Sequence, residues 1–388
     1  MTPQQTQHDR AGLTARAWPS PDFTGYAGPN QPDPPGTPHP LHDPPPWHQK
    51  LTDFGERPSW SPDGRRIAFI EKNYGDVCEI DLETRALRHL TRDLGDSHSF
   101  LRVLFLPTGD YLLIGPTGFK DRDTSRRVES ELWWMDARAR RPPRPLGRRI
   151  FEGLGVSAVA PRITYAVSGR NDPSLGAPDV FECHVTELEY GRDGVARPGA
   201  DRVIYRAESG SNLAPEPQDF RHRGGREDAE VIMAEYVRTR HAGREEGPTP
   251  PKCIVKGVEL ETGAVRTYVY EGGVHNECEG IFPDHEHICL ECSVDTPPPH
   301  GQNIDLWKLK LDGSGRRVRL TRMVERFPWR ATNSNVSPDG RWLAFMVNRQ
   351  GDEAGYGRGL GLLDLAAWEA SPAATAWDTA PVAPPAAD

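Results

Sequence analysis

His275, Glu277 and Glu279 form the densest group of ionisable residues whose spacing suits chemistry. They stand at alternate positions, and alternate side chains of a β-strand project from the same face. An imidazole and two carboxylates on one face can bind a divalent metal. The same groups can also transfer protons as a general base and a general acid. The sequence therefore predicts a metal site or a metal-free acid–base site around these residues.

The metal hypothesis takes His275 and Glu277 as ligands, with His98 or Gln218 completing the shell, and manganese, zinc and calcium as candidate ions. In the metal-free hypothesis, His275 or His98 acts as the base and Glu277 or Glu279 as the acid, with pKa values separated by their environments. A third alternative is a hydrogen-bonded polar channel that holds only ordered water. The residues alone leave all three open.

A repeated turn shows which elements would position these residues. Ser61–Arg65 reads Ser-Pro-Asp-Gly-Arg and recurs as Ser337–Arg341, with weaker copies at Leu106–Asp110, Phe282–Glu286 and Ala160–Arg162. Proline presets the second turn position, and Asp and Gly accept the later ones. An apolar strand follows each turn, with a sixth after a degenerate turn near residue 224. These strands are predicted at 67–70, 111–114, 163–166, 231–234, 288–290 and 343–346.

A second series of six alternating strands is predicted at 77–82, 132–136, 180–185, 254–260, 306–311 and 360–365. Three copies continue into Leu-Thr, but the last strand does not, and the first Leu-Thr, Leu51-Thr52, has no strand of this series before it. Joining the two ends completes one unit, as a propeller closes its ring. The prediction is an all-β single propeller with six blades, or seven as the alternative. It spans residues 48–367, between a Pro-rich extended arm over 1–47 and a disordered Ala/Pro-rich tail over 368–388.

Trp60–Phe69 and Asn335–Phe345 resemble the repeat of TolB-like propellers, which also occurs in oligogalacturonate lyases and in the propeller domains of prolyl oligopeptidases. His275–Asp284, Asp305–Trp307 and Leu311–Gly315 resemble a bacterial group of TolB-like proteins of undefined role. The resemblance implies a propeller over roughly residues 48–367 and leaves the activity open, because this fold hosts many functions.

The resemblance to oligogalacturonate lyases implies a metal held by His and Gln residues of the funnel, with another His as general base. This chain has no run of His residues that matches that cluster, and its His285 and His287 lie in a turn. Neither the pectin substrate nor the metal ligands therefore carry over residue by residue. The chain also lacks the Gly-x-Ser-x-Gly nucleophile elbow of a serine hydrolase.

The innermost strand of each propeller blade lines a central channel, so residues just before each turn should meet at one mouth. Ionised groups that converge in a partly dry funnel shift one another's pKa values, which a reactive site needs. The substrate-binding residues are predicted to be Arg57, Gln218, Asn333 and Asn335. Arg57 would bind a substrate carboxylate through two hydrogen bonds. The full set is Glu56, Arg57, His98, Glu152, Glu216, Gln218, Asp219, His275, Glu277, Glu279, Asn333 and Asn335.

Composition and simple sequence patterns restrict the possible binding partners and the expected cellular compartment. The net charge of −9 argues against sequence-independent binding of nucleic acid. No stretch approaches the roughly 18 apolar residues of a membrane helix. The N-terminus has no signal-peptide pattern, so we expect a cytoplasmic protein with reduced thiols. Cys289 and Cys292 fall in a predicted strand, where positions three apart face opposite ways, so they are expected to be structural. The oligomeric state stays open.

Two function hypotheses follow. In the first, a cytoplasmic enzyme of the lyase or isomerase type acts in the funnel on a polar small molecule, such as an acid sugar or a secondary metabolite. Its chemistry would be proton abstraction leading to elimination, cyclisation or epimerisation, and a pectin-fragment lyase is one form of it. In the second, a non-catalytic propeller binds a protein or a small ligand, which the absence of a strong catalytic signature favours.

Overall fold

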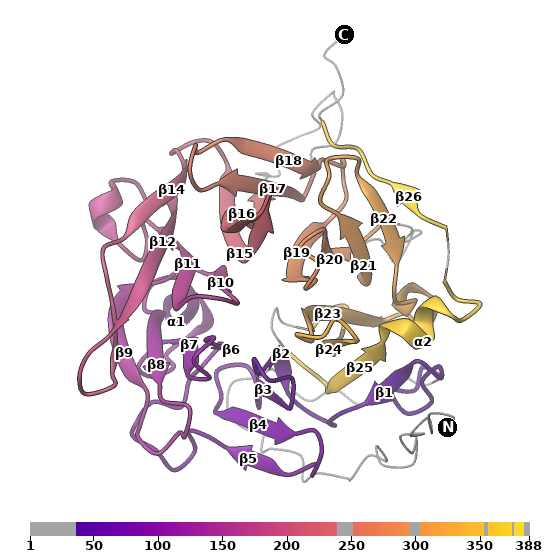
Figure 1. Ribbon diagram of the computed structural model, residues 1–388, viewed down its shortest axis with the longest axis horizontal. Coiled ribbons are helices and arrows are strands. Elements are labelled where there is room, and N and C mark those ends of the chain that lie inside the picture. The colour runs from indigo at the N-terminus through magenta and orange to yellow at the C-terminus, as the bar shows by residue number, and fades with distance from the viewer. Residues whose placement is uncertain (1–35, 239–250, 295–302, 353–355, 375, 384–388) are drawn as a thin grey trace, which may run out of the picture.

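The computed structural model describes residues 36–238, 251–294, 303–352, 356–374 and 376–383. It confirms the all-β prediction and has six blades, arranged as six sheets around a central axis (Figure 1). All twelve strands of the two predicted series are present, with ends that differ by a few residues at most. Most of the predicted arm, residues 1–35, lies outside the described part of the chain.

Each blade is an antiparallel sheet whose first strand lies nearest the axis. The first blade holds β2 (Glu56–Trp60), β3 (Arg66–Ile70), β4 (Val77–Asp81) and β5 (Leu87–His89). The second holds β6 (Arg102–Phe105), β7 (Tyr111–Gly115), β8 (Glu131–Met135) and β9 (Arg144–Arg149), with helix α1 (Arg122–Arg127) between β7 and β8. The third holds β10 (Leu154–Val156), β11 (Arg162–Ser168), β12 (Phe181–Tyr190), β13 (Ala196–Pro198) and β14 (Arg202–Ala207), with a 3₁₀ turn at Pro173–Leu175.

The fourth blade holds β15 (Leu213–Arg223), β16 (Arg226–Val237), β17 (Cys253–Glu259) and β18 (Val265–Val269). The fifth holds β19 (Asn276–Ile281), β20 (His287–Cys292), β21 (Asp305–Lys310) and β22 (Arg316–Arg319), followed by a 3₁₀ turn at Met323–Arg326. The sixth holds β23 (Trp329–Val336), β24 (Trp342–Arg349), β25 (Leu360–Asp364) and β1 (His48–Lys50).

The sixth blade draws its strands from both ends of the propeller. β1 pairs antiparallel with β25, so that His48 lies opposite Leu363 and Lys50 opposite Gly361. Just beyond β1, the Leu51 backbone N–H donates to the Leu360 carbonyl at 2.8 Å. An early strand thus completes a sheet built from late ones, which is the arrangement expected of a closed ring.

The hydrophobic core lies between the blades. In β3, Ile67 and Phe69 pack against the sixth blade, whereas Ala68 and Ile70 pack against the second. Both faces of such a strand are therefore buried, because alternate side chains point to opposite sides of the sheet. This explains why the second strand of each blade reads as a continuous apolar run.

The tail departs from the predicted disorder in its described residues. Helix α2 (Leu365–Glu369) places Trp368 in the core between the fifth and sixth blades. β26 (Asp378–Thr379) pairs with β22 and adds a fifth strand to the fifth blade. The Ala/Pro-rich composition favours disorder. Single apolar residues of the tail, such as Trp368 and Ala380, are nevertheless buried against the propeller. Composition alone does not reveal such tertiary contacts.

Candidate functional site

The central channel contains two chambers. One, the charged chamber, has a volume of about 270 Å³. The other, the apolar chamber, has a volume of about 400 Å³. Arg102 and Glu279 line both chambers and form an ion pair with each other. Asn333 Nδ2 donates to Glu279 Oε2 at 2.8 Å, and Arg102 Nη1 donates to Gln218 Oε1 at 3.4 Å. We call these four residues the partition.

The charged chamber gathers ionisable groups from every innermost strand or the loop that leads into it, from two second strands and from helix α1. Its acidic residues come from the third, fourth and fifth blades. Its basic residues come mainly from the first, second and sixth. The ionisable lining consists of Arg57, Arg102, Arg126, Arg330, Glu152, Glu216, Glu277, Glu279, Glu291, His275 and Tyr236.

His275, Glu277 and Glu291 form the group in this chamber that is able to hold a metal. One ligand atom of each lies within 4.8 Å of the others, and His275 Nε2 lies 3.3 Å from Glu277 Oε2. The structure thus joins the two predicted ligands, His275 and Glu277, to a residue that sequence reasoning missed. Glu291 sits directly opposite Glu277 in the β19–β20 hairpin. A lone carboxylate inside the apolar run of β20 was the signal that could have found it.

The environment separates the pKa values of the carboxyl groups. Burial opposes ionisation of Glu277, but hydrogen bonds from His275 and Tyr236 and the charge of Arg102 hold its pKa below the ordinary value. Burial and the charge of Glu277 raise the pKa of Glu216 to about 8. Burial, reinforced by Glu277 and Glu279, raises the pKa of Glu291 well above the usual range. An ionised carboxylate therefore stands among carboxyl groups that keep their protons near neutral pH, as acid–base sites require.

β-bulges lie at the junction of the chambers. Four innermost strands shift register at this level: β2 after Glu56, β15 after Pro217, β19 after Cys278 and β23 after Thr332. A bulge adds one residue to a strand and redirects its side chains.

Three of these bulges contain a residue in the left-handed region: Arg57 at φ 53°, Gly280 at φ 92° and Asn333 at φ 47°. Non-glycine residues rarely adopt such values, and they cluster at functional sites. A Cβ on Gly280 would come within 2.9 Å of the Ser334 carbonyl oxygen, so this position requires glycine.

The predicted site residues divide between the two chambers. Arg57, His275, Glu277 and Asn333 line the charged chamber, and Glu279 lines both as part of the partition. Gln218, Asp219 and Asn335 line the apolar chamber, while Glu152 and Glu216 line the charged one. Glu56 is buried beside the channel and lines neither chamber, and its pKa is raised by burial to about 8. The residues predicted for one site in the funnel thus divide between two chambers in the structure.

His98 also lies outside both chambers, and its position corrects both the metal and the catalytic assignments. It lies in the loop before β6 and lines neither chamber; its Nδ1 is 2.8 Å from Asp76 Oδ1 and its Nε2 is 3.1 Å from the Gly95 carbonyl. The hydrogen bond to Asp76 raises its pKa. The strand begins four residues later than His98, so Arg102 takes the place in the channel that the turn spacing assigned to the histidine.

Other residues of the charged chamber had no readable signal. Arg126 belongs to α1 and forms an ion pair with Glu152. Tyr236 lies near the end of β16, where its ring centroid is 5.8 Å from that of His275. Arg330 lies on β23 and donates to the Arg349 carbonyl at 3.0 Å. None belongs to the turn repeat that guided the prediction, so only the folded chain brings them to the axis.

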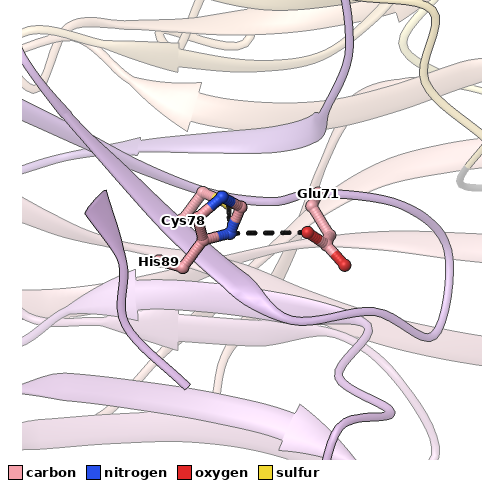
Figure 2. A group of neighbouring side chains, drawn as sticks. All are labelled: Glu71, Cys78 and His89. Carbon is pink, nitrogen blue, oxygen red and sulfur yellow. Dashed lines mark hydrogen bonds and ion pairs between the residues drawn. The ribbon is translucent and has the colours of Figure 1, made fainter. Parts of the chain in front are cut away.

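A second group with metal-ligand chemistry lies at the edge of the first blade (Figure 2). Cys78 Sγ is 3.2 Å from His89 Nδ1, which is 3.5 Å from Glu71 Oε2. Arg92 also donates to Glu71 Oε2, at 2.7 Å. Burial raises the pKa of Cys78 well above the ordinary value, so the thiol is neutral. Each donor already has a protein partner, and we interpret the group as a structural hydrogen-bond network.

The six cysteines are free and buried. Cys289 packs in the core toward the sixth blade and Cys292 in the core toward the fourth. This confirms that the two side chains point to opposite faces. Burial raises both pKa values to about 12, as expected of structural thiols.

No protein-family model and no curated protein sequence matches this chain. Among solved structures, the tricorn protease is 12% identical with a TM-score of 0.50, over 87% of this chain and 27% of that one. Oligogalacturonate lyase from Vibrio parahaemolyticus is 12% identical with a TM-score of 0.46, over 80% and 78%. TolB from Acinetobacter baumannii is 12% identical with a TM-score of 0.40, over 74% and 61%. At these identities the likeness concerns the propeller fold and not the activity.

The helices in the described part of the chain are too short and too polar to cross a membrane.

Proposed function

We propose that this chain is an enzyme that binds an anionic polar small molecule, of the acid-sugar kind, in the charged chamber and transfers a proton to or from it. The observation that carries the proposal is the composition of one small cavity. Guanidinium groups that can bind a carboxylate line it together with carboxyl groups of divergent pKa. Such a pairing of anion binding and proton transfer suits abstraction of a proton next to a carboxylate.

Two arginines supply the anion-binding part. The Nε atoms of Arg57 and Arg330 are buried and have no hydrogen-bond partner among the described residues. Both guanidinium groups line the charged chamber, so each can donate hydrogen bonds to an incoming anion. Burial first, and then the charge of Arg57, lower the pKa of Arg126 to about 10, so these two positive charges repel each other. A substrate carboxylate would relieve that repulsion and accept paired hydrogen bonds.

Glu216 supplies the proton-transfer part in this proposal. A general acid–base group works best when its pKa lies near the operating pH, and the pKa of Glu216 is about 8. Glu277 stays ionised beside it, held by His275 and Tyr236. Glu279 is paired with Arg102 in the partition, so we assign it a positioning role instead of the predicted acid role.

The residues present also fit a divalent cation. Glu277 and Glu291 are opposed across a hairpin, and such like-charged neighbours need a shared proton or a cation between them. With the imidazole of His275 they form a mixed nitrogen and oxygen set that suits zinc or manganese. When bound, the ion would stabilise negative charge that develops on the substrate carboxylate. Glu216 is outside this group and would still handle the proton.

The test is hydrogen exchange on candidate acids. The protein is incubated in D₂O with glucuronate, galacturonate and gluconate, and deuterium next to the carboxylate is followed by NMR. We expect exchange with at least one acid, reduced about 10²- to 10⁴-fold by Glu216→Gln. Arg57→Ala should weaken binding of the acid, whereas Arg65→Ala, in the exposed turn between β2 and β3, should not. Binding without exchange would make the chain a ligand-binding propeller, and no binding of any acid would contradict the proposal.

A further inference from the structure

The apolar chamber differs in chemistry from the charged one. At about 400 Å³ it falls within the usual size range of small-molecule sites, about 300–1,000 Å³. Its walls are the second halves of the innermost strands and the prolines of four turns, and they include Trp60, Phe105, Val156, Phe282 and Val336. The only guanidinium group among its described lining residues belongs to Arg102, whose charge is balanced by Glu279. An anion would therefore find no unpaired positive charge here.

The chamber also offers fixed hydrogen-bond donors. The rings of His222 and His285 stack with centroids 3.8 Å apart. His285 Nδ1 accepts from the His222 backbone N–H at 3.2 Å, and His222 Nδ1 accepts from the Asp228 backbone N–H at 2.9 Å. An imidazole nitrogen that accepts carries no proton, so each neutral ring carries its proton on Nε2. The stacked pair, which lines the chamber, thus supplies two N–H donors in addition to the polar groups of residues such as Gln218 and Asp219.

One aromatic wall is held in place before any ligand arrives. The Trp60 backbone N–H donates to Asn335 Oδ1 at 3.0 Å, and its indole Nε1 donates to the Asn335 carbonyl at 3.0 Å. A preformed wall reduces the entropy that a ligand must lose on binding. Asn335, predicted from the sequence to touch substrate, thus positions the tryptophan.

We propose that the apolar chamber is a second ligand site, which binds a small neutral aromatic molecule that carries a hydrogen-bond acceptor such as a ketone, ester or amide. The aromatic body packs between Trp60, Phe105 and Phe282, and the acceptor takes a hydrogen bond from the His222–His285 pair. Neither part uses the charged chamber, so this site is independent of the proposed reaction. The two sites share only the partition.

The experiment uses prodan, a neutral naphthyl ketone whose fluorescence responds to the polarity of its surroundings. It is titrated into the full-length protein, with 2-naphthoate as the anionic counterpart. We expect saturable 1:1 binding of prodan with a blue-shifted emission. We expect 2-naphthoate to bind at least about tenfold more weakly, because the one guanidinium group among the described lining residues, that of Arg102, is paired with Glu279 and cannot offset the lost hydration of a carboxylate.

Matched valine substitutions locate the probe. Val156→Glu places a charge inside the chamber and should weaken prodan binding about tenfold or more. Val159 lies at the rim and is 47% exposed, so Val159→Glu should fold normally and weaken binding less. Val203, on β14 away from the chamber, is 48% exposed, and Val203→Glu should change nothing. Glu277→Gln, in the charged chamber, should also leave prodan binding unchanged.

Three results would overturn the inference: prodan that fails to saturate, affinity that is the same in Val159→Glu and Val203→Glu, or binding that Glu277→Gln abolishes. Stronger binding of 2-naphthoate than of prodan would overturn the assignment to a neutral ligand. Failure of the acid-exchange experiment affects none of these results, so the two proposals stand or fall separately.

Discussion

The charged and apolar chambers are built by the same six innermost strands, yet they have opposite chemistry. In β19, Glu277 and Glu279 come first and Ile281 follows. In β23, Arg330 comes first and Val336 ends the strand. The change falls at the bulges, where the register shifts and the side chains are redirected. The apolar half continues the strand–turn unit that folds each blade, whereas the polar half holds most of the ionisable residues of the candidate site.

The comparison also shows two ways to bury a polar group in a propeller. Arg102 and Glu279 balance each other's charge at the partition. Glu56 and Glu216 form no ion pair with another described residue, and their raised pKa values keep them protonated instead. Both solutions avoid an unpaired buried charge, which is the costly state. The following experiments compare the two chambers and these two ways of burying a polar group. They are ordered from the largest expected effect to the smallest.

The metal content distinguishes the group in the charged chamber from the group at the edge of the first blade. We expect a divalent ion, measured by elemental mass spectrometry on protein purified without added metal, to be lost in His275→Ala and kept in His89→Ala. The reason is that the Glu71–Cys78–His89 donors already bond one another and Arg92. Loss in His89→Ala alone would move the metal site to the first blade.

Breaking the partition should cost the most stability. Arg102→Met leaves Glu279 buried without a counter-charge, which should lower the free energy of unfolding by about 3–5 kcal/mol. The double variant Arg102→Met, Glu279→Gln should recover most of the loss. Arg65→Met, which breaks the exposed pair with Glu83, should cost less than about 1 kcal/mol. Urea denaturation measures the stability of all three variants. Equal stability of the single and double variants would show that water reaches the partition and solvates the unpaired Glu279 carboxylate.

In the apolar half, the wall around Trp60 depends on one side chain. Asn335→Ala removes the acceptor of the Trp60 backbone N–H and should destabilise the protein by about 1–3 kcal/mol. Asn335→Asp keeps an acceptor at the same place and is the matched control. Thermal unfolding together with the prodan titration would test this, because the loss of the wall should also weaken prodan binding. Unchanged prodan affinity in Asn335→Ala would mean that Trp60 is not part of the ligand site.

The protonated carboxyl groups should make stability depend on pH. Burial raises the pKa of Glu56 in the folded state to about 8, from an ordinary value of about 4.5. The stabilising contribution of Glu56 is complete at pH values below the pKa of the unfolded state. It is lost as the pH rises toward the pKa of the folded state. From pH 5 to 8, the wild type should therefore lose stability relative to Glu56→Gln, by at most about 1.4 kcal/mol per pH unit. Glu83→Gln, at an exposed position, should follow the wild type, and parallel curves for wild type and Glu56→Gln would mean that Glu56 is ionised when buried.

The fold was largely predictable because each blade repeats one local rule. Every predicted strand of the two series was found, since the Pro-Asp-Gly turns and the apolar runs are encoded within short segments. The site was predictable only where it follows the same repeat. His275 and Glu277 were located because they precede a turn, whereas His98 was misplaced because the loop before β6 is longer than the repeat suggests.

The sequence by itself determined the propeller architecture, with six blades or seven, and the candidate pair His275 and Glu277, because strand period and turn chemistry act over a few neighbouring residues. The structure decided in favour of six blades. The tertiary structure alone decided that the channel has two chambers, that Arg102 pairs with Glu279, and that Glu291, Arg126 and Tyr236 join the site. These features depend on residues far apart in the chain that meet at the axis. Bulges set where each side chain points, and a pattern of alternation cannot show a bulge until the strands are paired.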